Sequence, residues 1–138
     1  MGYGHYWSAF GGLPDAFLVS VRQVVAHVGW TLDDVIRDGA RVLIVSPPGY
    51  VLMELGNEPG SCATGGGLTD TVVVAVLALA SHFGLTTVRS DGDRFDWEDR
   101  VAWAREVTGL DVAVPKTIRE PQYAPGFDDE VIDDDIPF

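Results

Sequence analysis

Apolar residues recur at helical spacing in three stretches of the chain, which predicts helices over residues 14–28, 70–83 and 96–108. The first stretch is amphipathic. The second is apolar on nearly every side, so it is expected to be the buried centre of the fold. Gly29 and Gly109 follow the first and third stretches, where glycine commonly ends a helix.

Runs rich in β-branched and aromatic residues predict four strands, near residues 3–8, 41–46, 50–55 and 85–89. The middle two flank Pro47-Pro48-Gly49, a sequence that suits a tight turn, so they are expected to form a hairpin. Residues 31–37 predict a short additional helix, and the glycine-rich residues 56–69 predict a flexible loop. These elements indicate an α+β domain with about three helices on a small mixed sheet. The helices argue against an all-β oligonucleotide-binding (OB) barrel.

Polar side chains precede the second and third helices, and Thr69 or Asp70 and then Asp96 are expected as their N-caps. Five acids lie between residues 91 and 99. Their spacing is not that of a calcium-binding loop, and capping together with the helix dipole accounts for most of them. No metal site is therefore expected.

The helical and strand patterns end after Pro115, and several proline and glycine residues follow. We expect a globular domain over residues 1–115, a linker over 116–127 and a flexible acidic tail over 128–138. No basic, apolar leader pattern opens the sequence, and the longest apolar run is too short to cross a membrane, so a cytoplasmic protein is expected. The sequence leaves the oligomeric state open.

The chain of 138 residues carries a net charge of −12. Six acids lie in the tail, which leaves 15 acids against 9 bases in residues 1–126. An acidic body argues against strong non-specific binding of nucleic acid, because that binding depends on neutralising phosphates.

Sequence patterns of known catalytic sites are absent. No His-Glu-x-x-His, Cys-x-x-Cys, Gly-x-Ser-x-Gly or phosphate-loop pattern occurs, so neither an enzyme activity nor a cofactor is expected. The lone Cys62 fits a reducing compartment. Neither Cys62 nor the loop Gly65–Gly67 receives a role from the sequence.

Aromatic and small residues alternate at the start of the chain, so Tyr3, His5 and Trp7 are expected to share one face of a strand. That face could pack against a helix as part of the core, or it could be a platform on which bases stack. Six of the nine bases lie in residues 89–119, although acids there leave a net charge of −1. Those expected to contact DNA beside the aromatic platform are Arg89, Arg94, Lys116 and Arg119.

The last six residues combine three acids with an apolar tip: Asp133, Asp134, Asp135, Ile136, Pro137 and Phe138. Pro137 favours extended geometry at the tip. Phe138 could enter a pocket while its carboxylate meets an arginine and the aspartates lie on a basic rim. These six residues resemble the acidic C-terminal tip of bacterial single-stranded-DNA-binding proteins. The resemblance implies docking of host replication, recombination and repair proteins.

The opening also resembles an uncharacterised group of phage proteins that begin Met-Gly-Tyr-x-His-Tyr-Trp. Residues 74–77 and 90–92 and Trp97 resemble that group as well. The two resemblances together imply a phage DNA-metabolism protein that binds single-stranded DNA, or associates with proteins that do, and recruits host enzymes through its tail. The alternative is a decoy that occupies the tail-docking pockets of host enzymes without binding DNA.

Overall fold

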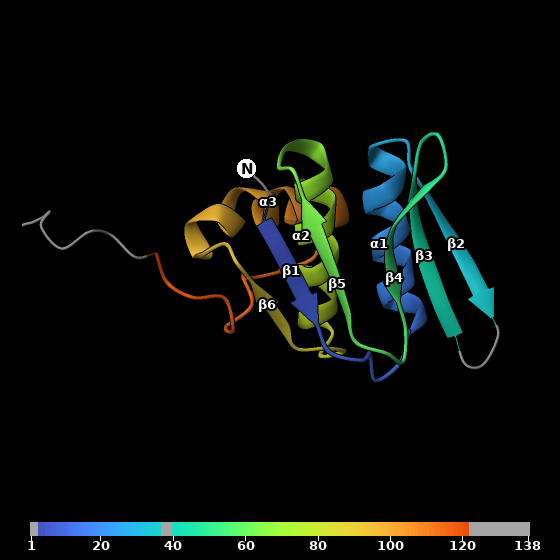
Figure 1. Cartoon of the computed structure of the whole chain (residues 1–138), viewed down its shortest axis with the longest axis horizontal. Coiled ribbons are helices and arrows are strands. Elements are labelled where there is room, and N and C mark those ends of the chain that lie inside the picture. Colours follow the sequence, from blue (N-terminus) through green and yellow to red (C-terminus); the bar gives the residue numbers. More distant parts are fainter. Residues whose placement is uncertain (1–2, 37–39, 122–138) are drawn as a thin grey trace, which may run out of the picture.

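The computed structural model describes residues 3–36 and 40–121 (Figure 1). The α+β class is confirmed, with three helices at the predicted places and no closed barrel among the described residues. In chain order the elements are β1 (Tyr3–Trp7), α1 (Asp15–His27), β2 (Thr31–Ile36), β3 (Ala40–Ser46), β4 (Tyr50–Leu55), β5 (Gly60–Thr64), α2 (Gly67–His82), β6 (Val88–Ser90) and α3 (Arg94–Thr108).

The strands form two three-stranded sheets, in the orders β5-β1-β6 and β2-β3-β4. Every pairing is antiparallel, so the single mixed sheet expected from the sequence is replaced by two antiparallel ones. Figure 1 shows the helices behind the sheets, with α1 behind β2-β3-β4 and α2 and α3 behind β5-β1-β6. One face of each sheet therefore supports the core, and the other face is open.

Two predictions of local structure were wrong. Residues 31–36 are strand β2, because they pair with β3 from Thr31 opposite Val45 to Ile36 opposite Ala40. Residues 60–64 are strand β5, which pairs along the whole of β1. In both cases long-range strand pairing decides the conformation, and local propensity is too weak to oppose it.

The caps of α2 and α3 also differ from the predicted ones. Asp93 caps α3, and Asp96 is its partner three residues later in a reciprocal capping box. Gly66, with a φ of 87°, precedes α2 without a side-chain cap, and Asp70 points into the interior instead. Gly109 ends α3 in the left-handed conformation, as expected.

Helix α2 is the centre of the core, as its sequence predicted: every residue from Val72 to Ala80 is buried. The packed part of the chain continues past the boundary expected at residue 115. Ile118 is 3% exposed, and the hydroxyl of Thr117 donates to the carbonyl of Val88. The docking segment Asp133–Phe138 lies outside the described residues. None of the described helices is long and apolar enough to cross a membrane.

Candidate nucleic-acid interface

The two faces of β1 have opposite surroundings. His5 and Trp7 are 1% and 4% exposed, whereas Tyr6 between them is 41% exposed. Burial leaves no ring face of His5 or Trp7 for a base to stack on, so these two belong to the core alternative. The side chain of Tyr3 lies outside those that the structure describes.

His5 is the middle of a buried chain of polar groups. Its Nε2 lies 2.7 Å from Oδ1 of Asp70, and its Nδ1 lies 2.8 Å from Oγ of Ser90. Asp70 also accepts a hydrogen bond of 2.5 Å from Thr64, and its other oxygen lies 2.8 Å from Nε of Arg100. That Nε has no aligned hydrogen bond, so its contact with Asp70 is mainly electrostatic.

The partners of Ser90 fix the proton positions in this chain. Its Oγ accepts from the amide of Gly92 at 3.0 Å and from Nε1 of Trp97 at 3.2 Å. Both lone pairs are then used, so the hydroxyl proton points to Nδ1 of His5. The remaining ring proton on Nε2 is therefore donated to Asp70.

The order serine, histidine, aspartate is that of a hydrolytic triad, but the surroundings do not suit a nucleophile. The lone pairs of Ser90 are occupied, and His5 has almost no access to solvent. These hydrogen-bonded side chains instead connect β1 to α2 and β6. We assign them a structural role.

The electrostatics of Asp70 agree with that role. Burial alone would raise the pKa of Asp70, but hydrogen bonds from His5 and Thr64 and the nearby charge of Arg100 outweigh it and lower the pKa. The carboxylate thus stays ionised inside the core, where its partners stabilise it.

The open face of the β5-β1-β6 sheet brings together Tyr6 and two arginines predicted to contact DNA, Arg89 and Arg119. Tyr6 lies directly opposite Arg89 on β6, and both side chains are exposed. A hollow of about 410 Å³ lies there, lined by Tyr6, Arg89, Ser90, Asp91, Thr117 and Arg119. An exposed aromatic ring thus stands beside two arginines.

Arg119 is held in place by the segment that follows α3. Its guanidinium donates to the carbonyl of Asp91, and its own carbonyl accepts from the amide of Arg94 at 2.8 Å. Asp91 offsets part of the positive charge, since its carboxylate lies at the same hollow and accepts from the amide of Gly4 at 3.0 Å. Arg89 and Arg119 together outweigh the single carboxylate of Asp91, so the charged side chains that line the hollow carry a net positive charge.

The other predicted bases are placed differently. Arg94 donates to the carbonyl of Pro115 and lies 3.4 Å from the carboxylate of Glu120, so it anchors the segment after α3. Lys116 is exposed but does not line the hollow. Phe95, which follows Arg94 in the first turn of α3, is 72% exposed and does not line the hollow.

Tyr6 and Phe95 are not among the residues predicted from the sequence, because that prediction rests on the odd-numbered face of β1 and on the apolar face of α3. The sequence periodicity nevertheless indicates that both side chains lie on the surface. The same period of two that buries His5 and Trp7 turns Tyr6 outward, and Phe95 falls outside the buried face defined by Trp97 and Val101.

The remaining reactive groups do not form a site. No cluster that could hold a metal ion occurs within residues 3–36 and 40–121, and Asp93 and Asp96 are used in the capping box. Burial, and secondarily the charge of Asp70, raises the pKa of the Cys62 thiol, which lowers its reactivity. Gly66 and Gly67 have positive φ angles and form the turn into α2.

In comparisons with known proteins, no family model matches this chain, and no curated protein or solved structure is significantly similar to it. The features of this chain that bear on its function are the hollow at Tyr6 and the sequence of its last six residues.

Proposed function

We propose that the protein binds single-stranded DNA on the open face of the β5-β1-β6 sheet and docks partner proteins through residues Asp133–Phe138. The observation that supports DNA binding is that Tyr6, Arg89 and Arg119 line one hollow, with Tyr6 directly opposite Arg89 in the sheet. An aromatic ring can stack on any base, and arginines beside it can contact the neighbouring phosphates.

The site is expected to be local and sensitive to salt. The net charge of −12 repels a polyanion at long range, so affinity has to come from close contacts. One stacked base contributes about 1–3 kcal/mol. Phe95 is a candidate for a second stacked base, because its neighbour Arg94 contacts the backbone of Arg119.

The docking half of the proposal is supported by the resemblance of the last six residues to the tip of single-stranded-DNA-binding proteins. In this reading the protein is a phage-type factor in DNA replication and recombination that acts in the host cytoplasm. DNA held on the sheet would be brought to the host enzymes bound by the tip.

The test is a titration of a fluorescent oligo-dT of about 12 nucleotides with the full chain at several salt concentrations. Tyr6→Ala should weaken binding about tenfold or more, since it removes one stacking ring. Arg89→Ala should weaken binding and lower its salt dependence by about one phosphate contact. Tyr50→Ala is the matched control, because Tyr50 is an exposed tyrosine on the other sheet.

The second candidate is the decoy, which binds tail-docking pockets and no DNA. The acidic composition favours it, because the body alone carries 15 acids against 9 bases. The oligo-dT titration, together with a titration of the full chain into a host tail-receptor enzyme, separates the two functions. A full chain that binds a host tail-receptor enzyme but shows no salt-dependent affinity for oligo-dT would establish the decoy and remove the DNA site.

A further inference from the structure

Two unpaired strand edges face each other between the sheets. Strand β4 is the last strand of the order β2-β3-β4, and β5 is the first of β5-β1-β6. They are consecutive in the chain and lie next to each other (Figure 1), but no ladder joins them among the described residues. Such edges present backbone N–H and C=O groups that can pair with another chain.

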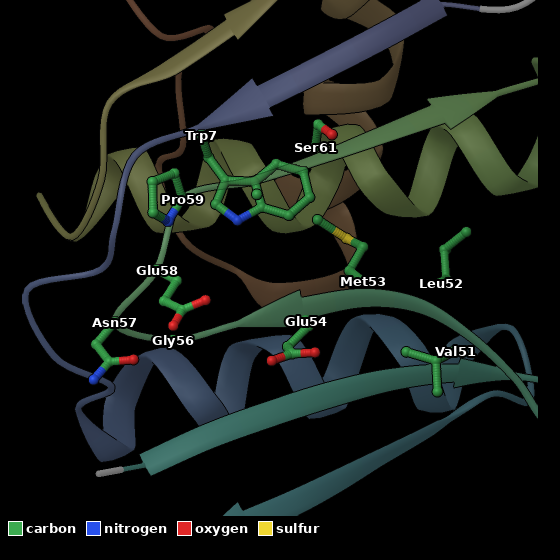
Figure 2. A pocket seen from close by; sticks show the side chains of 11 residues that line it. Trp7, Val51, Leu52, Met53, Glu54, Gly56, Asn57, Glu58, Pro59 and Ser61 are labelled. Atoms are coloured by element: carbon green, nitrogen blue, oxygen red, sulfur yellow. The ribbon is translucent and has the colours of Figure 1, made fainter. Parts of the chain in front are cut away.

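A pocket of about 500 Å³ lies at this seam, lined by β4, β5, the residues that connect them, and Trp7 (Figure 2). Its size is within the range of ligand-binding pockets. Residues 51–54 of β4 and residues 60–61 of β5 form two of its walls. An extended peptide can use both walls at once.

Trp7 supplies a hydrogen-bond donor without a partner at the wall of this pocket. Its Nε1 is buried and makes no hydrogen bond. The indole can occupy this position because residue 60 is glycine: a Cβ there would lie 2.5 Å from the ring. Figure 2 shows the indole between Pro59 and Met53, with its nitrogen edge turned toward β4. Buried donors of this kind normally have an acceptor, and a peptide carbonyl is a suitable one after a small rotation of the ring.

The charge of the pocket selects the side chains of the peptide. Glu58 and Glu54 both line it and are exposed, and no lysine or arginine is among its lining residues. Glu54 also interacts within the protein, so Glu58 is the carboxylate on which the selection depends. A cationic side chain is favoured here and an acidic one is repelled.

We infer that the seam between β4 and β5 binds an extended segment of a partner protein that carries lysine or arginine, added as a strand along these edges. In strand addition the main-chain hydrogen bonds supply affinity, and pockets for alternate side chains supply selectivity. The carbonyl nearest Trp7 accepts from its Nε1, and a basic side chain lies against Glu58. This inference is independent of the proposed DNA site.

The experiment uses the full ¹⁵N-labelled chain and three capped hexapeptides at about 150 mM salt, where long-range attraction is screened. The first alternates lysine and valine. The second alternates lysine and proline and has the same charge, but proline removes the N–H groups and breaks the strand. The third alternates glutamate and valine. Only the lysine–valine peptide should shift the indole N–H signal of Trp7, and it should slow amide exchange in both β4 and β5.

Two variants test the residues that carry the inference. Glu58→Lys should weaken the lysine–valine peptide about tenfold, because an attraction becomes a repulsion. Trp7→Phe should weaken it severalfold while leaving thermal stability equal or higher, since the substitution removes the unpaired donor. Asp99→Lys, at an exposed acid on α3, is the matched control for a change in net charge and should leave affinity unchanged.

Equal binding of the lysine–proline peptide, or shifts confined to residues outside the seam, would show charge attraction alone and overturn the inference. So would protection of β4 and β5 that rises with protein concentration without peptide, because a second copy would then fill the seam. No binding by the lysine–valine peptide overturns it as well.

Discussion

Nε2 of His5 and Oδ1 of Asp70 lie 2.7 Å apart in the core, although 65 residues separate them in the chain. His5 comes from β1 and Asp70 from the first turn of α2, so the hydrogen bond fixes the sheet against the central helix. A buried carboxylate is tolerated here because Thr64, His5 and Arg100 all contact it.

Asp70→Ala should destabilise the fold by about 3–5 kcal/mol, because it leaves buried donors and the charge of Arg100 without their partner. Asp70→Asn keeps an acceptor oxygen and should cost less. Chemical denaturation with a matched control, Asp99→Ala at an exposed position on α3, measures both. A loss of stability for Asp70→Ala no larger than that for Asp99→Ala would contradict the structural role of the buried hydrogen bonds around His5 and Asp70.

The pKa of Asp70 is lowered in the folded protein, and this fixes the sign of its pH effect. Ionised Asp70 stabilises the fold at pH values above its unfolded pKa of about 4. The contribution is lost as the pH falls from there through the lowered folded pKa. The stability difference between the wild type and Asp70→Asn should therefore shrink below about pH 4. Denaturation of both proteins from neutral to acidic pH tests this, and a difference that grows toward acid would refute it.

Trp7 and Tyr6 should respond in opposite ways to alanine substitution. Trp7→Ala removes a core ring and should cost about 3–5 kcal/mol of stability. Tyr6→Ala removes a ring that is partly exposed and outside the core, and it should change stability by about 1 kcal/mol or less while weakening oligo-dT binding. Thermal melting and the DNA titration on the two variants give both readings. A Tyr6→Ala protein that melts far lower and binds DNA normally would reverse the assignment of the two faces.

Residues Asp133–Phe138 should dock through separable contributions. Deleting Phe138 removes the aromatic ring and displaces the terminal carboxylate, so affinity for a host tail-receptor enzyme should collapse. Adding residues after Phe138 should have nearly the same effect. Changing Asp133, Asp134 and Asp135 to asparagine should weaken binding in part and mainly flatten its salt dependence.

Calorimetric titration of each variant into the enzyme separates these contributions. The triple asparagine variant is the control for the deletion, since it keeps the apolar tip. Equal affinities for the full chain and the Phe138 deletion would remove the docking function.

Local pattern determined the helices and the hairpin. The apolar pattern of α1, α2 and α3 is formed by residues close in sequence. Gly109 ends α3 through its own left-handed backbone conformation. The hairpin of β3 and β4 needs only the three-residue connection Pro47-Pro48-Gly49 between two β-rich runs. Such signals need no distant partner, so one sequence is enough to find them.

Tertiary structure decided what depends on distant partners. Residues 31–36 and 60–64 became strands because β3 and β1 offered edges to pair with. The period of two showed that His5 and Tyr6 point to opposite faces, but only the packing of α2 and α3 decided which face is buried. The approach of Arg119 to Tyr6 across 113 residues likewise comes from the fold, because strand pairing and the anchored segment after α3 place them at one hollow.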